Sequence, residues 1–239
     1  IISALILLKI GLHVNLFMAF GWFGYVLTVG WILLLLNAFN FIDSIDAHCS
    51  GVAIISLAMF LFLTHLVHQA AVGIFVAALL GAILGFFPYN WKPARCFLGD
   101  NGSLFIGYML SVVTLLCRYR GFSDSHFSSV TPLIPLLMFG VPIYDTVSVI
   151  IVRTFRGIPP WKGDRNHFAH RLVRMGMSEK MAVIFSYFIV FTLGLLALLS
   201  TQIDTFLGKV LILSVFVSVI AVIGFLVIRK MKKERTLPA

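Results

Sequence analysis

Long apolar runs separated by short polar segments dominate the chain. A helix that crosses a membrane needs about 20 apolar residues, and most of these runs approach that length. We expect one helix in each of the runs at residues 1–12, 20–42, 51–67, 70–87, 102–117, 130–152, 180–200 and 206–228. No alternation of apolar and polar residues competes for a strand. The pattern predicts an all-α fold, a polytopic transmembrane bundle of about eight helices.

Composition supports a membrane protein. Of 239 residues, 60% are hydrophobic and only 11% are charged, whereas soluble domains average about 25% charged residues. We expect a single transmembrane domain over residues 1–239. The three cysteines have no metal-ligand spacing and are expected to be free of disulfides. Because the chain begins without Met inside an apolar run, we expect N-terminal helices to be missing.

The basic residues indicate an orientation. If the helices alternate in direction, the loops 43–50, 88–101 and 153–179 and the tail 229–239 lie on one side, which carries fourteen of the eighteen Lys and Arg. Cytoplasmic loops carry an excess of these residues, so this side is expected to be cytoplasmic. Most of the net charge of +9 lies in short loops, and we expect no nucleic-acid partner.

The first polar stretch, residues 37–48, ends the apolar run 20–42. It holds two carboxamides, Asn37 and Asn40, and two carboxylates, Asp43 and Asp46. On a helix, acids three residues apart share a face about 5–6 Å apart and repel each other unless a cation lies between them. The stretch contains no Lys or Arg, so Mg²⁺, which takes oxygen ligands, is a candidate. The alternative is a polar helix end with Asp43 as the N-cap of the next helix.

The second polar stretch, residues 97–103, lies between a basic loop and the run 102–117. Its glycines permit close backbone approach, and Asn101 and Ser103 are good N-cap types. A helix N-terminus suits a phosphate, and Asp100 beside it suits the metal ion of that phosphate. Phe97 could stack on a base. The alternative is an ordinary turn and cap, with Phe97 used in packing.

The third polar stretch, residues 153–171, collects four Arg, one Lys and two His. Arginine binds phosphates through two parallel hydrogen bonds, and histidine donates to phosphate oxygens or moves protons. The alternative is a solvated positive loop. Zinc is not favoured, because His167 and His170 have no third ligand of the right kind nearby. Asp145, inside the run 130–152, is expected to pair with an Arg or to line the same cavity, supporting the site without touching metal.

Taken together and in this order, these motifs resemble the polyprenyl-phosphate N-acetylhexosamine-1-phosphate transferases, glycosyltransferase family 4, which are related to phospho-N-acetylmuramoyl-pentapeptide transferase. The resemblance rests on residues 37–46, 97–103, 142–146 and 153–172, and it covers residues 1 to about 176. The Asp-Arg-x-His form of residues 164–167 is similar to the branch that starts O-antigen, teichoic-acid or capsule-type glycans.

The resemblance implies transfer of a sugar-1-phosphate, here HexNAc-1-phosphate, from a UDP-sugar to polyprenyl (undecaprenyl) phosphate with release of UMP. The reaction would depend on Mg²⁺, with Mn²⁺ as an alternative, on the cytoplasmic face of the bacterial inner membrane. By analogy Asp100 is a catalytic residue and metal ligand, and the catalytic Asp43 and Asp46 line the nucleotide and sugar-phosphate site. The substrate-binding residues are Asn40, Phe97 (on uracil), Arg153, Asp164, Arg165, His167 and His170. As partners we expect the UDP-sugar, the lipid phosphate and the membrane, with a second copy of the chain left open.

The chain departs from the family pattern at three places. The adjacent Asp pair of the family is expected upstream of residue 1, and without it the metal and phosphate site is incomplete. Ala47 stands where Gly is usual, and Ala169 where a second His is usual. The alternatives are a phospho-N-acetylmuramoyl-pentapeptide transfer, a non-catalytic binding protein and a transporter. A transporter would place acids at the bilayer midplane and show an internal repeat, and neither is visible.

Overall fold

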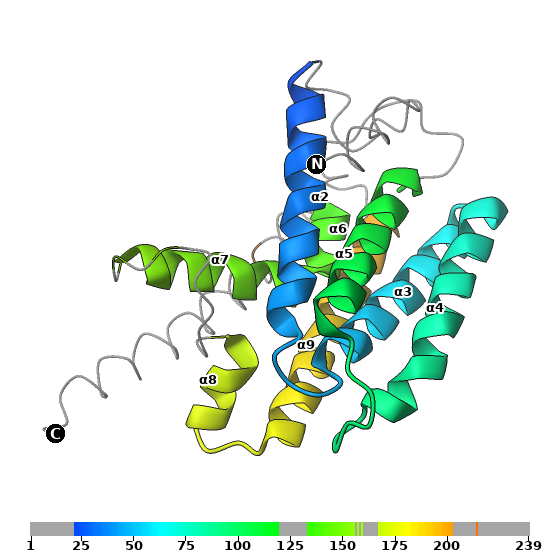
Figure 1. Ribbon diagram of the computed structural model, residues 1–239. Helices are drawn as coiled ribbons and strands as arrows, with labels where there is room; N and C mark the ends of the chain where they lie inside the picture. The colour runs from blue at the N-terminus through cyan, green and yellow to red at the C-terminus, as the bar shows by residue number, and fades with distance from the viewer. Residues whose placement is uncertain are drawn as a thin grey trace, which may run out of the picture.

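The computed structural model describes residues 22–119, 133–155, 157, 159, 167–202 and 214. Within these ranges every regular element is a helix, which confirms the all-α prediction (Figure 1). The predicted helix over 1–12, and that over 206–228 apart from residue 214, lie outside the described residues. The helices are α2 (Phe23–Ile42), α3 (His48–Leu66), α4 (Ala70–Asn90), α5 (Gly99–Leu116), α6 (Leu133–Met138), α7 (Gly140–Phe155), α8 (Phe168–Arg174) and α9 (Glu179–Gln202).

Four of the described helices are long and apolar enough to cross a membrane: Phe23–Ile42, His48–Leu66, Ala70–Asn90 and Glu179–Thr201. Such lengths match the hydrocarbon core of a bilayer, and the chain is an integral membrane protein, as predicted. Helix α4 lies at the edge of the bundle in Figure 1, and few of its side chains are buried. Its apolar outer surface therefore suits lipid.

The core is built where α2 meets α5 and α3 meets α9. Phe139 forms aromatic contacts with Phe39 of α2 and Phe60 of α3, with ring centroids 5.7 and 5.6 Å apart. Gly107 of α5 lies against the backbone of α2, because a Cβ at this position would be 2.6 Å from the carbonyl oxygen of Leu35. This close approach brings the start of α5 to the end of α2.

The prediction of a single helix over residues 130–152 is wrong, because the structure contains two helices, α6 and α7, with Phe139 between them. Pro142 has no N–H to donate to the carbonyl of Met138, four residues earlier. The hydroxyl of Ser56 on α3 donates to that carbonyl instead, at 3.3 Å. A neighbouring helix thus satisfies the group that the break leaves open.

Helix α7 has two distinct faces and runs across the direction of α2 in Figure 1. One face buries Asp145, Val149 and Arg153. The other exposes apolar side chains, among them Ile151 and Phe155, the latter 88% exposed. With 16 residues, α7 is shorter than a membrane span, and its exposed apolar face suits the lipid region next to the bundle.

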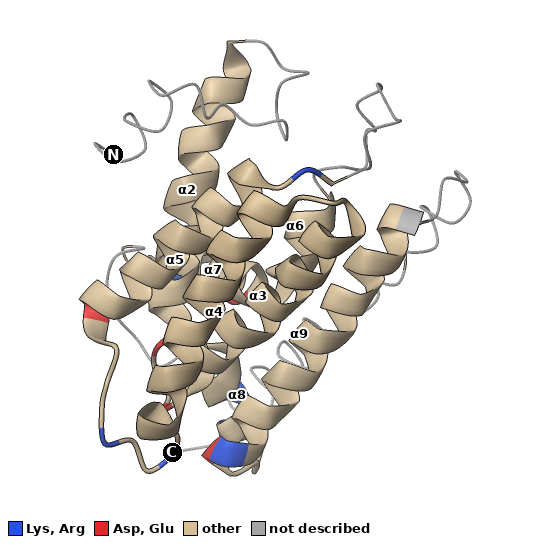
Figure 2. Ribbon diagram, turned by 90° about the vertical axis from the view of Figure 1, so that its right-hand side faces the viewer, with Lys and Arg blue, Asp and Glu red and all other residues tan. Residues whose placement is uncertain are grey.

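The end of the bundle at which α2 ends and α5 begins also holds α8 and the start of α9 (Figure 1). Helix α8 lies in the segment 153–179 that was expected to be a loop. Charged positions concentrate toward this part of the molecule, while the middles of the helices carry few (Figure 2). An ion pair between Lys92 and Glu179 joins the α4–α5 loop to α9.

Candidate active site

Asn40, in the last turn of α2, joins the first polar stretch to the second. Its Nδ2 donates to Oδ1 of Asp100 at 3.1 Å and to Oγ of Ser103 at 3.0 Å. Asp100 and Ser103 both lie in the first turns of α5. Two predicted site residues sixty positions apart, Asn40 and Asp100, are therefore in direct contact.

Asp43 and Asp46 lie in the turn between α2 and α3, so the expectation that they share a helix face is wrong. Helix α2 ends at Ile42, with Asp43 as its C-cap. Ala47 precedes α3 in the left-handed region, at φ 62°. Because Ala47 is the N-cap of α3, the alternative role of Asp43 as that cap is also wrong. Asp46 Oδ2 accepts a hydrogen bond from the Ala94 N–H at 3.2 Å, which ties the turn to the α4–α5 loop.

The carboxyl group of Asp43 is in a region of concentrated negative charge. Burial, together with the neighbouring Asp100 and Asp46 carboxylates, raises its pKa to about 7. The three acids predicted as catalytic therefore interact electrostatically. Such a group binds a proton or a cation more readily than an isolated carboxylate does.

These residues fit a magnesium ion that takes part of its ligands from elsewhere. Among the described residues, no three His, Cys, Asp or Glu side chains form a group that could hold a metal ion. Mg²⁺ usually keeps several waters and is bound by one or two carboxylates plus substrate phosphates. Burial is the first cause of the raised pKa of Asp43, and the nearby Asp100 and Asp46 carboxylates add to it, so a cation beside them would offset their mutual repulsion.

The α4–α5 loop is held firmly and presents Phe97 to the outside. The buried Asn90 accepts from Ser50 Oγ at 2.7 Å and donates to the Cys96 carbonyl at 3.0 Å. Phe97 is 73% exposed, so it does not pack within the described part of the chain and is available to stack on a ligand.

The predicted helix cap in this stretch is wrong. Helix α5 begins at Gly99, and no side chain caps it, so Asn101 and Ser103 lie inside its first turns. The Ser103 hydroxyl donates to the Gly99 carbonyl at 3.0 Å while it accepts from Asn40. Ser103 thus supports Asn40, a role that the sequence pattern did not indicate.

Phe41, next to Asn40, contacts the third polar stretch. Its ring centroid is 5.6 Å from that of His167 and 5.5 Å from Cζ of Arg153. Arg153 is 1% exposed, so the alternative interpretation of this stretch as a solvated loop does not hold for Arg153. His170 lies on α8, with its ring 6.5 Å from that of His167. Adjacent residues of α2 therefore contact members of two groups: the acidic group, which consists of Asp43, Asp46 and Asp100, and the basic group, which consists of Arg153, His167 and His170.

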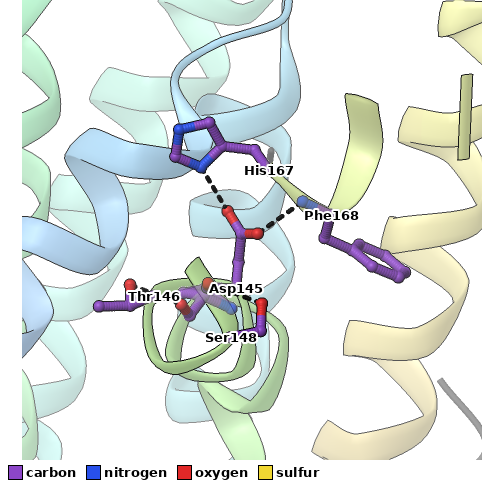
Figure 3. Close-up of polar contacts among 6 residues, drawn as sticks. Asp145, Thr146, Ser148, His167 and Phe168 are labelled. Atoms are coloured by element: carbon purple, nitrogen blue, oxygen red, sulfur yellow. Dashed lines mark hydrogen bonds and ion pairs between the residues drawn. The ribbon is translucent and has the colours of Figure 1, made fainter. Parts of the chain in front are cut away.

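Asp145 holds His167 in place from α7. The carboxylate is fully buried, and its Oδ2 lies 2.9 Å from Nδ1 of His167 while Oδ1 accepts the Phe168 N–H at 2.5 Å (Figure 3). Asp145 was expected to support the site, but its histidine partner was not foreseen. A contact between residues 22 positions apart leaves no local sequence signal.

Two of the predicted substrate-binding residues, Asp164 and Arg165, lie outside the described residues, and their roles stay predictions. Phe41 was not singled out, although its place beside Asn40 at the end of an apolar run was a usable signal. His48 is also buried at this end of the bundle, and neither ring nitrogen has a hydrogen-bond partner among the described residues.

A groove of about 760 Å³ lies elsewhere, between the C-terminal half of α3 and the N-terminal half of α4. Its polar lining includes His65, His68 and Gln69. None of the predicted site residues lines it. The groove is thus separate from the junction at the end of α2.

The junction at the end of α2 has the chemistry of a phosphate-handling site. Asp43, Asp46 and Asp100 supply negative charge on one side, and Arg153, His167 and His170 supply positive charge or N–H donors on the other. Phosphate binding commonly combines such donors with a metal ion held by carboxylates. An exposed aromatic ring, Phe97, lies in the loop next to Asp100.

Comparison with known proteins gives a consistent result. Residues 1–118 match the family described as glycosyl transferase family 4. A "probable undecaprenyl-phosphate N-acetylglucosaminyl 1-phosphate transferase" of Bacillus subtilis is 36% identical over 89% of this chain and 58% of its own length. The phospho-N-acetylmuramoyl-pentapeptide-transferase of Limosilactobacillus fermentum is 32% identical over 75% of this chain and 54% of its own length.

A third relative extends the same likeness at lower identity. The undecaprenyl-phosphate alpha-N-acetylglucosaminyl 1-phosphate transferase of Yersinia pestis is 24% identical over 91% of this chain and 59% of its own length. The chain thus spans somewhat more than half the length of these curated relatives. Together with the ordered motifs and the membrane helices, these matches show that the chain belongs to glycosyl transferase family 4.

Proposed function

We propose that the protein containing this chain transfers HexNAc-1-phosphate from a UDP-sugar to polyprenyl (undecaprenyl) phosphate and releases UMP, initiating synthesis of a cell-wall or surface glycan. In this reaction an oxygen of the lipid phosphate forms a bond to the β-phosphorus of the UDP-sugar. The bond from that phosphorus to the bridging oxygen breaks, and UMP leaves with the oxygen. The names of the relatives support the lipid acceptor.

The observation that carries the proposal is the junction at Asn40 and Phe41. Asn40 contacts Asp100, and Phe41 contacts both His167 and Arg153. A diphosphate needs its charge neutralised and its oxygens oriented, and phosphoryl transfer depends mostly on these two effects. The junction supplies both at the end of a membrane-spanning helix, where a lipid and a soluble nucleotide can meet.

Each side chain has a role that follows from its place. Arg153, His167 and His170 would orient the phosphate oxygens and offset their charge. Phe97, exposed in the loop before α5, would stack on the uracil ring. Asn40 would keep the Asp100 carboxylate turned toward α2, and Asp43 and Asp46 would line the sugar-phosphate side. Asp164 and Arg165 are proposed to join the substrate site on the strength of the sequence resemblance.

Asp100, with Asp43 beside it, would hold Mg²⁺, or Mn²⁺ in its place. A bound divalent ion offsets the negative charge of the phosphates during transfer. The chain's own part is to keep two carboxylates close together in a partly buried place, although this raises the pKa of Asp43.

The membrane setting supplies the lipid substrate. The apolar exposed face of α7, opposite the buried Asp145 and Arg153, gives a polyprenyl chain a surface beside the site. The excess of Lys and Arg in the loops that carry the site supports a cytoplasmic location on the bacterial inner membrane. A homodimer stays a prediction from the resemblance.

A second candidate function is transfer of phospho-N-acetylmuramoyl-pentapeptide, which the Limosilactobacillus fermentum relative favours. The two functions share the acceptor and differ in the nucleotide donor. The Asp-Arg-x-His form of residues 164–167 favours the simple HexNAc donor. Donor competition between UDP-HexNAc and UDP-N-acetylmuramoyl-pentapeptide separates them.

The test measures UMP release by the full-length protein in membranes. With Mg²⁺ and UDP-GlcNAc or UDP-GalNAc, release is expected only when undecaprenyl phosphate is present. Asp100→Asn is expected to lower the rate about 100-fold or more, because the carboxylate that would hold the charge-offsetting divalent ion is lost. Glu179→Gln, which removes an acid at the same end of the bundle, serves as the control and should stay within about twofold. Release without the lipid, or an unchanged rate in Asp100→Asn, would refute the proposal.

A further inference from the structure

Asp145 binds two consecutive residues of the chain at once. Its Oδ2 lies 2.9 Å from Nδ1 of the His167 ring, and its Oδ1 accepts a hydrogen bond from the backbone N–H of Phe168 at 2.5 Å. Figure 3 shows the carboxylate between them, rising from α7 toward the start of α8. The side chain therefore fixes both the ring of His167 and the backbone from which that ring extends.

Both oxygens of the Asp145 carboxylate are engaged by these two contacts. Asp145 is 0% exposed, and a buried carboxylate is costly unless its oxygens are hydrogen-bonded. The rings of Tyr144 and Phe168 meet edge to face at 6.0 Å and pack α7 against the start of α8. The Ser148 hydroxyl donates to the backbone carbonyl of Asp145 at 3.0 Å and not to its carboxylate. Asp145 is thus placed to act through His167, without contact with a substrate.

The contact decides which nitrogen of His167 faces the site. A carboxylate accepts hydrogen bonds and donates none, so Nδ1 must carry a proton. The other nitrogen, Nε2, points away from Asp145 (Figure 3). When Nε2 also binds a proton and donates to a phosphate oxygen, the ring becomes positively charged, and the Asp145 carboxylate stabilises that charge.

We propose that Asp145 is a positioning residue that acts through His167, holding Nδ1 protonated and presenting Nε2 to the phosphates of the donor. This inference rests on the proposed function for the identity of the ligand. The claim about the protonated nitrogen concerns the protein alone and can be tested without any substrate.

Asp145→Asn is the informative variant, because it keeps the shape of the side chain. Its Oδ1 still has to accept the Phe168 N–H, so its amide N–H group faces Nδ1 of His167. Nδ1 must then accept, and the proton moves to Nε2. Ser148→Ala is the matched control on α7, since it removes a hydrogen bond to the same residue but leaves the Asp145–His167 contact intact.

The first experiment observes the ring nitrogens by ¹⁵N NMR of histidine-labelled protein in detergent or nanodiscs, with His167→Ala to assign the signal. Nδ1 of His167 is expected to be protonated in the wild type and in Ser148→Ala, and unprotonated in Asp145→Asn. An unprotonated Nδ1 in the wild type would overturn the proposal. The same protonation state of Nδ1 in the wild type, Ser148→Ala and Asp145→Asn would overturn it as well. This readout does not depend on enzymatic activity.

The second experiment is a double-mutant cycle in the UMP-release assay. Asp145→Asn should lower kcat/KM for the donor by about 10- to 100-fold, as loss of a ligand-orienting group does. In the His167→Ala background the same substitution should change it by less than about twofold, because the residue through which it acts is gone. If Asp145→Asn lowered kcat/KM equally in the wild-type and His167→Ala backgrounds, the positioning role would be contradicted, while the transferase function would stand. If the wild type released no UMP, the proposed function would be refuted, while the NMR result would remain valid.

Discussion

The acidic group at the end of α2 should make the protein less stable as pH rises when no divalent cation is present. Burial, with help from Asp100 and Asp46, raises the pKa of Asp43 from 3.8 to about 7. The folded state therefore binds this proton more tightly than the unfolded state does. The resulting stability is complete below the unfolded pKa near 4 and is lost as pH rises through about 7.

The magnitude follows from the shift. A shift of about three pKa units corresponds to about 4 kcal/mol at 1.36 kcal/mol per unit. Because Asp43 is only partly buried, solvent screening reduces this to about 2 kcal/mol. About three-fifths of the change, a little over 1 kcal/mol, falls between pH 5 and pH 8, which corresponds to a melting temperature lower by about 4 °C.

The assay follows tryptophan fluorescence during thermal unfolding in detergent with a chelator present. Asp43→Asn removes the titrating group and should reduce the difference in melting temperature between pH 5 and pH 8 by about 4 °C. Ser44→Ala, an exposed neighbour in the same turn, should behave like the wild type. If Asp43→Asn lost as much stability with rising pH as the wild type, the description of the acidic group would be wrong.

Three other predictions concern packing, an unpaired buried side chain and orientation. Gly107→Ala should destabilise the protein by about 1–3 kcal/mol, because the added Cβ would meet the backbone of α2. Gly81→Ala, which has open space around it, is the control and should have no such effect. Equal losses of stability in thermal unfolding would contradict the close approach of α2 and α5. His48→Leu should raise stability by about 1 kcal/mol, because neither ring nitrogen has a hydrogen-bond partner in the described part of the chain, and a loss of stability would show that the ring has a partner. Cys96, exposed in the α4–α5 loop, should react with a membrane-impermeant maleimide in inside-out vesicles and not in right-side-out vesicles. Cys96→Ser is the control. The opposite labelling pattern would contradict the expected cytoplasmic location of this loop.

The sequence predicted the helical membrane fold because apolar runs of about 20 residues have few other structures available in a bilayer. It did not predict the break at Phe139. Pro142 gave a local reason to expect a break, but a proline alone does not decide it, because α4 continues past Pro88 to Asn90. At the break, the hydroxyl of Ser56 on another helix donates to the open Met138 carbonyl, and no local pattern reveals such a partner.

The candidate site was predicted in its composition more than in its geometry. Asn40 and Asp100 were both named from their motifs, and the structure brings them into contact. The helical spacing assumed for Asp43 and Asp46 was wrong, because the left-handed Ala47 lies at a turn that their spacing does not reveal. The contacts of His167 with Phe41 and Asp145 depend on how distant segments fold together.

The central claim is that the acidic and basic groups on either side of Asn40 and Phe41 hold one diphosphate between them. The most direct measurement is a structure of the full-length protein with Mg²⁺ and UDP-GlcNAc. The diphosphate should lie between Asp100 on one side and Arg153 and His167 on the other. A nucleotide bound away from this junction, for instance in the groove lined by His65 and His68, would contradict the claim.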